Sequence, residues 1–386
     1  MRKCKKAVFA IFLMLAVVLC TFSVESHACT GIRLKTEDGN YIFARTLEFD
    51  AETLEYDLLF VPRNYKYTGQ TTSGEPGMPW ETKYAHVGFD PFGMSVVGDG
   101  LNEKGLACGV FFFPGYAGYK KVVKDDYPKT ISCLDFASWV LSTCASVFEV
   151  RALLPEINVC GVEMPEWGYV PPLHYIVADD TGEAIIIEYT DGKLHIYDNE
   201  VNVITNSPDY TWHTTNLRNY IGLSPNNNPS IKIGEKDISQ LGQGSGAIGL
   251  PGDFSPPSRF IRAAFFANSA YQGKDPDEGI SVAFHILNQF DIPKGSIRDN
   301  EDGKVIADST QWTSAADLTN RRYYYHTYHD RSVRMVDLDK LDLNAKDISI
   351  IKDIQKPGNI TDVSEQLLLL ILISNSFLIN LLSMRI

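Results

Sequence analysis

The segment CTGIRLKTEDGNYIFARTLEF, residues 29–49, begins with a cysteine and then alternates in the two-residue period that is typical of strands. The dipeptide Asp38-Gly39 is a strong hairpin signal, and it lies between the strand-like stretches Gly31–Lys35 and Asn40–Arg45. The sequence therefore predicts an antiparallel strand pair directly behind Cys29.

The 28 residues before Cys29 have the organisation of a secretory signal peptide. A basic start precedes an apolar run from Ala7 to Leu19, and small residues stand at the −3 and −1 positions of a cleavage site. This run is too short for the ~20 residues of a membrane span. A lipoprotein cut before Cys20 is an alternative, although Leu19 fits poorly where such a cut needs a small residue. We expect export to the periplasm or the cell exterior, with Cys29 as the first mature residue.

A cysteine at a mature N-terminus carries both a nucleophile and a base. A free thiol has a pKa of about 8.5, and the attacking form is the thiolate. The α-amine of the same residue, with a pKa of about 7.7–8.0, is able to accept that proton. Before the cut this nitrogen is a nonbasic amide, so the protein would be silent until processed. On position alone, the alternative that Cys29 is merely the residue beside a cleavage site is equally good.

The composition is that of a globular, enzyme-sized domain, with 44% hydrophobic, 11% aromatic and 22% charged residues. The formal net charge changes from −13 to −16 when the leader, with four cations and one anion, is removed. Such an acidic product is a poor candidate for binding nucleic acid. The interior shows no linker or repeat. We expect a signal peptide at 1–28, one domain at 29–345 and a C-terminal tail at 346–386.

Strand patterning occurs in groups that are separated by helical spacing, which favours antiparallel sheets covered by helices over a parallel sheet. Polar stretches at Thr68–Gly77 and Ser224–Ser230 are expected to be surface loops. Helices are expected at Ile131–Leu141, Val147–Leu154, Pro257–Asn268 (with Ser255 as N-cap) and Glu278–Gln289. Further strands are expected at Tyr56–Val61, Tyr84–Phe89, Met94–Gly98, Leu106–Phe113, Leu173–Ala178, Ala184–Tyr189, Lys193–Tyr197, Gln311–Asp317, Arg321–Thr327 and Val333–Val336.

The cysteine count leaves one reactive candidate. An odd number of cysteines in an exported protein leaves at least one thiol unpaired, and the N-terminal one is the natural candidate. Cys133 is expected to be a buried small hydrophobe, and a bridge between Cys144 and Cys160 stays open. Five cysteines follow the leader: Cys29, Cys108, Cys133, Cys144 and Cys160.

Several short blocks occur in a fixed order along the chain. They are CTGIR (29–33), ARTLEF (44–49), GLNEKGL (100–106), FPGY (113–116), TNSP (205–208), LPGDF (250–254), SRF (258–260) and RRYYY (321–325). Each block alone is a weak signal, but the ordered set is specific. It resembles the choloylglycine hydrolase and penicillin V acylase family of N-terminal-nucleophile amidases, from Cys29 to about Leu341.

The resemblance implies an α+β fold, a four-layer αββα sandwich of two antiparallel sheets flanked by helices. It also implies four site roles: Cys29 as nucleophile, Arg45 near its sulfur, Asn206 as oxyanion donor and Arg259 as the residue that orders the site. A cation near sulfur favours thiolate, and a fixed amide donor can contribute ~10²–10³ in rate. From the residues alone, other interpretations stay open: a surface charge for Arg45, a turn residue for Asn206 and a helix-face ion pair for Arg259.

Two positions depart from the family pattern. Glu48 stands where the family commonly has aspartate, so a carboxylate near the thiol and the α-amine is kept but moves out by one methylene. Phe112 stands where relatives often have asparagine or tyrosine, so a polar group is lost. We expect Phe112 to contact the substrate, with a backbone N–H such as its own as the second oxyanion donor.

The implied reaction is hydrolysis of a linear amide through a thioester, without a cofactor. The expected substrate joins an apolar acyl group to a small polar amine: conjugated bile salts first, penicillin V second and N-acyl homoserine lactones third. The family implies a homotetramer. An alternative of another class is an exported binding protein that kept this fold and lost turnover.

Other candidate residues are weaker. A papain-like cysteine hydrolase would need a histidine base, for which His174, His195 and His213 are candidates. Their spacing does not suit a zinc site.

Three aspartates beside glycine or proline are expected to be turn carboxylates: Asp90, Asp99 and Asp253. The broken apolar tail after Val363 is expected to be a non-native end or an interfacial segment, with at most weak membrane association.

Overall fold

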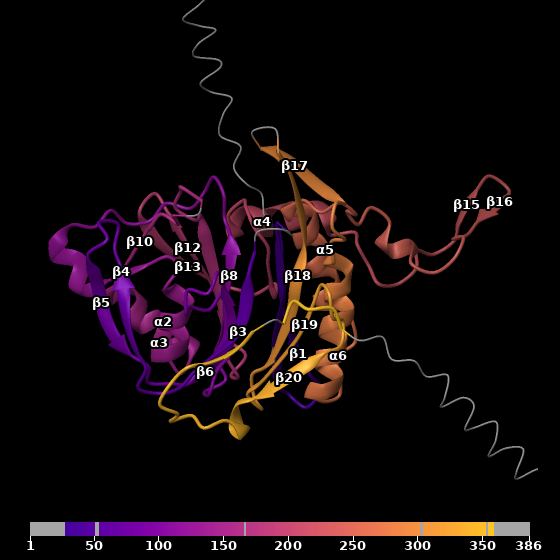
Figure 1. The fold of residues 1–386 in the computed structure, drawn as a ribbon. Coiled ribbons are helices and arrows are strands. Elements are labelled where there is room, and N and C mark those ends of the chain that lie inside the picture. The colour runs from indigo at the N-terminus through magenta and orange to yellow at the C-terminus, as the bar shows by residue number, and fades with distance from the viewer. Residues whose placement is uncertain (1–27, 51–53, 166, 302–303, 353, 359–386) are drawn as a thin grey trace, which may run out of the picture.

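The computed structural model describes residues 28–50, 54–165, 167–301, 304–352 and 354–358. Residues 1–27 of the expected signal peptide and the apolar part of the tail lie outside these residues. Two large antiparallel sheets face each other between layers of helices (Figure 1). This is the expected four-layer αββα arrangement.

The first sheet carries Cys29 at the start of an inner strand. Its order is β14-β1-β2-β18-β19-β20, and β17 pairs with β18. The predicted hairpin is confirmed, with Cys29 opposite Leu47 and Gly31 opposite Arg45. Its strands are β1 (Cys29–Lys35), β2 (Tyr41–Asp50), β14 (Val203–Ile204), β17 (Ile297–Glu301), β18 (Lys304–Asp317), β19 (Arg322–Thr327) and β20 (Arg334–Asp337).

The second sheet has the order β13-β12-β11-β8-β7-β6-β3-β21. Its edge strand β21 pairs with β3 and lies beyond residue 345, so this sheet includes chain that was expected to belong to the tail. Its strands are β3 (Tyr56–Val61), β6 (His86–Pro91), β7 (Asp99–Asn102), β8 (Ala107–Phe112), β11 (Leu173–Ala178), β12 (Ala184–Thr190), β13 (Lys193–Asp198) and β21 (Ser349–Ile351).

Helices cover the outer face of each sheet (Figure 1). On the first sheet, α5 (Pro256–Ser269) contacts β1 and β14, while α6 (Pro276–Leu287) contacts β2 and β18. On the second, α2 (Phe136–Thr143) and α3 (Val147–Leu153) share an apolar cluster with the strands. The short helix α4 (Tyr210–Asn216) begins at the N-cap Asp209, whose side chain accepts from the Trp212 amide. Ser255 is the N-cap residue of α5, as expected, but its hydroxyl bonds Asp253 rather than the helix backbone.

Three expectations about secondary structure are wrong, and two of them concern small sheets. The stretch Thr68–Gly77 contributes to a hairpin of β4 (Lys66–Gln70) and β5 (Pro76–Glu81) rather than a plain loop. The first part of Ile131–Leu141 belongs to β9 (Thr130–Ser132), because it pairs in parallel with β10 (Asn158–Cys160). Long-range pairing overrides local helical spacing there.

The stretch Met94–Gly98 is the third error, since no strand forms there. Ser95 has a positive φ of 58°, and its amide donates to the Asp90 side chain at 3.0 Å. The Val97 amide donates to the Ser138 hydroxyl at 3.0 Å. Side chains thus satisfy backbone groups that a strand ladder would otherwise use.

The interior of the sandwich is apolar and aromatic. Phe89 stacks on Trp312 across the two sheets, with ring centroids 4.4 Å apart. The five cysteines from Cys29 onward are all buried and free, so Cys144 and Cys160 are not bridged. Among the described residues no single helix is long and apolar enough to cross a membrane, and one sharply bent pair, Phe136–Thr143 with Val147–Glu156, passes that test by length and composition alone.

Candidate active site

Cys29 lies at the start of β1 and is only 4% exposed. Its backbone nitrogen donates to the Asn206 Oδ1 at 2.9 Å, and its carbonyl accepts from Arg259. On the other side of the same peptide bond, the Ala28 carbonyl accepts from the Glu48 amide at 2.9 Å. Two of the residues singled out from the sequence, Asn206 and Glu48, therefore contact the peptide bond whose cleavage would free the Cys29 amine, and Arg259 holds the next carbonyl.

Arg259 ties α5 to the start of β1. Besides the Cys29 carbonyl, its guanidinium donates to the Thr30 hydroxyl at 3.0 Å and to the Asn206 Oδ1 at 2.6 Å. Its Nε donates to the Phe254 carbonyl at 2.8 Å. Burial lowers the pKa of Arg259 to about 10, and the nearby Glu48 opposes that shift. A helix-face ion pair is excluded, because the side chain is fully buried against Cys29 and Asn206.

Arg45 approaches the site from the second strand of the hairpin and is fully buried. It donates to the Val110 carbonyl at 2.8 Å and lies over the Phe111 ring, 4.4 Å from the centroid. Burial raises the pKa of the Cys29 thiol, and the charge of Arg45 is the largest influence in the opposite direction. The alternative of a strand-end surface charge is therefore wrong.

Asp99 belongs to this site, and its expected role as a turn carboxylate is wrong. It is a buried residue of β7 with its carboxylate 3.8 Å from Arg45. It accepts from Trp312 Nε1 at 2.9 Å, from the Ser314 hydroxyl at 2.6 Å and from the Tyr323 hydroxyl at 2.5 Å. These donors come from β18 and β19 of the other sheet, so sequence position beside Gly100 gave no hint of them.

Glu48 is also fully buried, and its Oε1 accepts from the Thr310 hydroxyl at 3.0 Å. Burial raises the pKa of Glu48 to about 7, although the Arg259 charge opposes the shift. The Glu48 charge in turn raises the pKa of the Cys29 thiol, by less than Arg45 lowers it. The carboxylate thus lies near the thiol, as the sequence suggested, and Thr310 is a partner that no sequence signal indicated.

Asn206 has its carboxamide fixed at both ends. The oxygen accepts from the Cys29 nitrogen and from Arg259, and Nδ2 donates to the Phe112 carbonyl at 2.8 Å. Asn206 is therefore more than a residue of the turn before Ser-Pro. Its second Nδ2 hydrogen is the group available to a substrate oxygen.

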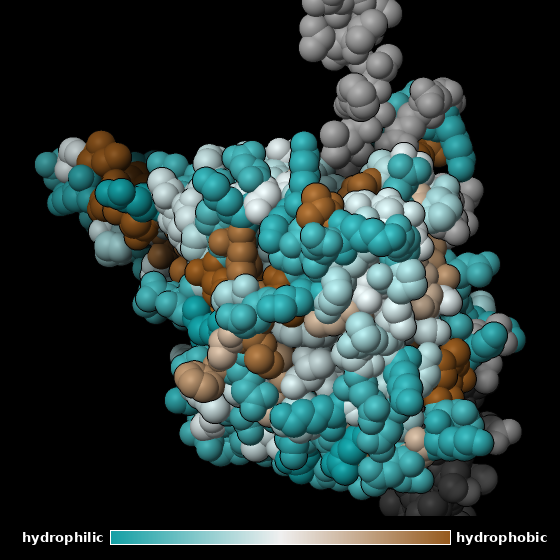
Figure 2. Space-filling model, turned by 90° about the vertical axis from the view of Figure 1, so that its left-hand side faces the viewer, coloured by the Kyte–Doolittle hydropathy of each residue, from teal (hydrophilic) through white to brown (hydrophobic). Residues whose placement is uncertain are grey.

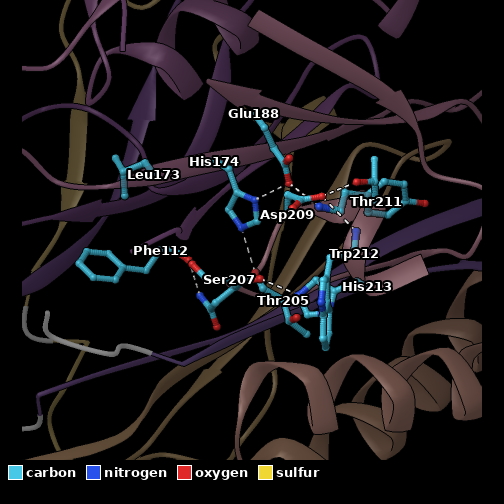
Figure 3. A network of polar contacts seen from close by, with 12 residues as sticks. Phe112, Leu173, His174, Glu188, Thr205, Ser207, Asp209, Thr211, Trp212 and His213 are labelled. Carbon is cyan, nitrogen blue, oxygen red and sulfur yellow. Dashed lines mark hydrogen bonds and ion pairs between the residues drawn. The ribbon is translucent and has the colours of Figure 1, made fainter. Parts of the chain in front are cut away.

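The partners of the three candidate histidines in the described structure are backbone carbonyls, a carboxylate and aromatic rings. His174 Nε2 lies 3.1 Å from the Thr205 carbonyl, and His213 Nε2 lies 2.9 Å from the Asn206 carbonyl (Figure 3). His195, on β13, stacks on Tyr197 at 6.2 Å. The structure thus gives no support to a papain-like histidine base. Among the described residues, no group of three histidine, cysteine, aspartate or glutamate side chains could hold a metal ion.

An apolar cavity adjoins Cys29. Trp167 stacks on Phe49 with centroids 5.5 Å apart, and Phe112 lies against the edge of Trp167 at 6.4 Å. The face of the molecule shown in Figure 2 is mainly hydrophilic, with hydrophobic residues gathered in a few patches. The apolar wall of the cavity includes Leu47, Phe49, Phe92, Phe112, Met164 and Trp167.

Comparisons with known proteins agree with this geometry. The family model "Linear amide C-N hydrolases, choloylglycine hydrolase family" matches residues 29–351. A bile salt hydrolase/transferase of Clostridium perfringens is 37% identical over 329 residues, 84% of this chain and 96% of that protein. A penicillin V acylase of Pectobacterium atrosepticum is 29% identical, with 91% of each chain covered. The crystal structure of a variant of the conjugated bile acid hydrolase from Clostridium perfringens superposes with a TM-score of 0.75 at 34% identity, over 87% of this chain and 100% of that one.

Proposed function

The chain belongs to the choloylglycine hydrolase family of linear amide C–N hydrolases, and from this premise we propose that it cleaves conjugated bile salts with Cys29 as nucleophile. The observation that carries the proposal is the position of Cys29, between a set of buried polar groups and an apolar cavity. A steroid acyl group is large and apolar, and its glycine or taurine amine is small and polar. The relative at 37% identity is named a bile salt hydrolase/transferase.

The reaction follows from the contacts of Cys29. The Cys29 thiolate attacks the amide carbonyl and forms a carbon–sulfur bond, while the carbonyl oxygen takes the negative charge. The free Nδ2 hydrogen of Asn206 donates to that oxygen. The Cys29 α-amine, freed by processing and held by the Asn206 Oδ1, takes the thiol proton and donates it to the amide nitrogen. The tetrahedral intermediate then collapses to the thioester, the carbon–nitrogen bond breaks and the amine leaves. Water then hydrolyses the thioester and restores the thiol.

Penicillin V is the second candidate, and N-acyl homoserine lactones are the third. The aromatic pair Phe49 and Trp167 in the cavity wall would suit the phenoxy ring of penicillin V. Parallel assays of glycine-conjugated and taurine-conjugated bile salts, penicillin V and an acyl homoserine lactone on one preparation test the order. A kcat/KM for penicillin V above that for the bile salts would overturn it, and turnover of none would favour a silent binding protein.

Export and processing remain part of the proposal. The Ala28–Cys29 peptide bond is contacted by Glu48 and Asn206, and Arg259 holds the Cys29 carbonyl, which supports Cys29 as the mature terminus. Intact mass of the secreted protein should correspond to a chain that starts at Cys29. A mature chain that starts at Ala28 or earlier, yet has full activity, would contradict the α-amine mechanism.

We also propose a homotetramer. A hairpin of β15 (Ile231–Ile233) and β16 (Lys236–Ile238) projects from the body (Figure 1), and every residue of its two strands is exposed. It carries exposed isoleucines at 231, 233 and 238. Such side chains are unusual on a free arm and would be covered by another copy. Light scattering should give four chains, and Ile231→Asp with Ile233→Asp should reduce that number.

A further inference from the structure

Two buried histidines hold the backbone on either side of the Asn206 side chain. His174, from β11, bonds the Thr205 carbonyl, and His213, from α4, bonds the Asn206 carbonyl (Figure 3). Both histidines are only 2% exposed. The family comparison and the reaction above assign neither of them a role.

His174 is fixed on three sides. Its Nδ1 lies 3.3 Å from Glu188 Oε1, and its ring stacks on Phe113 with centroids 4.3 Å apart and planes 3° apart. Figure 3 shows Glu188 on one side of the His174 ring and Thr205 on the other. A carbonyl oxygen can only accept, so the Nε2 of His174 donates to the Thr205 carbonyl.

Glu188 also connects His174 to the start of α4. Its Oε1 also accepts from the Tyr210 amide at 3.0 Å, at the start of α4. From α4, the His213 ring reaches back to the Asn206 carbonyl and stacks on Phe260, the residue after Arg259, with centroids 4.5 Å apart. The chain from Thr205 to His213 is thereby held at both ends, with Asn206 between the contacts.

We propose that His174 and Glu188 are positioning residues that set the Asn206 carboxamide for oxyanion stabilisation. The inference rests on the proposed function of Asn206 and adds the pair that holds it. The Asn206 side chain must keep contacts with Cys29, Arg259 and Phe112 at once, so its backbone has little freedom to move. A shift of about 1 Å at such a group can cost ~10²-fold in rate.

The first test compares three single variants. His174→Leu removes the donor to Thr205, and kcat should fall ~10–100-fold with KM changed less than about threefold. His174→Gln, which can still donate to that carbonyl, should recover part of the loss. His195→Gln is the matched control, because His195 lies directly opposite Glu188 on the neighbouring strand but has no contact with Thr205 in the described structure; it should keep kcat.

The second test shows whether the pair acts through Asn206. Asn206→Ala alone should lower kcat ~10²–10³-fold. The double variant with His174→Leu should have a kcat within about threefold of that of Asn206→Ala. Multiplied losses in the double variant would overturn the proposal, as would a normal kcat in folded His174→Leu. If His174→Leu fails to fold, Glu188→Gln replaces it, with an expected loss of ~3–10-fold in kcat and the same non-additivity.

A third measurement needs no substrate, so it separates this inference from the proposed function. Hydrogen exchange of the Asn206 side-chain amide, followed by NMR in asparagine-labelled protein, should be faster in His174→Leu than in His195→Gln. If the two variants differ in this way but the protein hydrolyses none of the amides, the proposed function alone is overturned. Equal exchange rates in the two variants would overturn the positioning role.

Discussion

The two sides of Cys29 are built in different ways. On the polar side, Arg259 and Asn206 make directed hydrogen bonds to Cys29 itself, and Arg45 acts on the thiol through its charge. On the apolar side, the cavity is enclosed by side chains such as Phe112 and Trp167, which touch through rings. Directed bonds tolerate little displacement, whereas an apolar wall needs only shape and volume. The polar side should therefore determine the reaction, and the apolar side the acyl group.

Removing the nucleophile on the polar side should cause the largest loss of activity. Cys29→Ala should lower kcat ~10³-fold or more, because no thioester can form. Cys160→Ala is the control, since Cys160 is a buried free thiol in the small β9–β10 sheet. Initial rates on a bile salt conjugate measure both. Full turnover by Cys29→Ala would contradict the proposed mechanism.

Removing the charge beside the sulfur should have the next largest effect. Arg45→Met takes away the largest influence that lowers the pKa of the Cys29 thiol. The thiolate fraction near neutral pH should fall, so alkylation by iodoacetamide and kcat/KM should both drop ~10–100-fold. Arg33→Met, which removes a half-buried arginine from the same hairpin, should leave alkylation unchanged. Equal alkylation rates in the two variants would show that Arg45 does not activate the thiol.

A change in the apolar wall should act on substrate binding instead. Trp167→Ala removes a ring that stacks on Phe49, so KM for a bile salt should rise ~10-fold with kcat within about threefold. Trp80→Ala, in the remote β4–β5 hairpin, is the control. A fall in kcat at unchanged KM would contradict the assignment of acyl-group binding to the apolar side of Cys29.

The smallest effect concerns stability and pH. The pKa of Glu48 is raised by burial from 4.5 to about 7, so between these values the folded state binds a proton that the unfolded state releases. Stability from this group is therefore present at low pH and is lost as pH rises to about 7, by up to ~1.4 kcal/mol per pH unit. Urea unfolding of wild type and Glu48→Gln at pH 5, 6 and 7 measures the difference. An unchanged difference across this range would contradict a raised pKa.

The sequence predicted most of the fold where local patterns and tertiary pairing agree. The hairpin behind Cys29 and the strands β3 and β11 lie at or within a few residues of their expected places. It failed where distant chain supplied the partners. Asp99 has the sequence context of a turn, yet its donors come from residues more than two hundred positions away.

From the sequence by itself, the ordered blocks identified the amidase family. The sequence also predicts Cys29 as the reactive group, because a cysteine behind the expected cleavage site would unite a thiol with its own base. Only the tertiary structure decided what surrounds that cysteine. Burial raises the pKa of the thiol and of Glu48, and the charge of Arg45 opposes the shift at sulfur. His174 and Glu188 reach the Asn206 segment from another sheet. Electrostatic and hydrogen-bond effects depend on distance in space, which neighbouring letters in a chain do not encode.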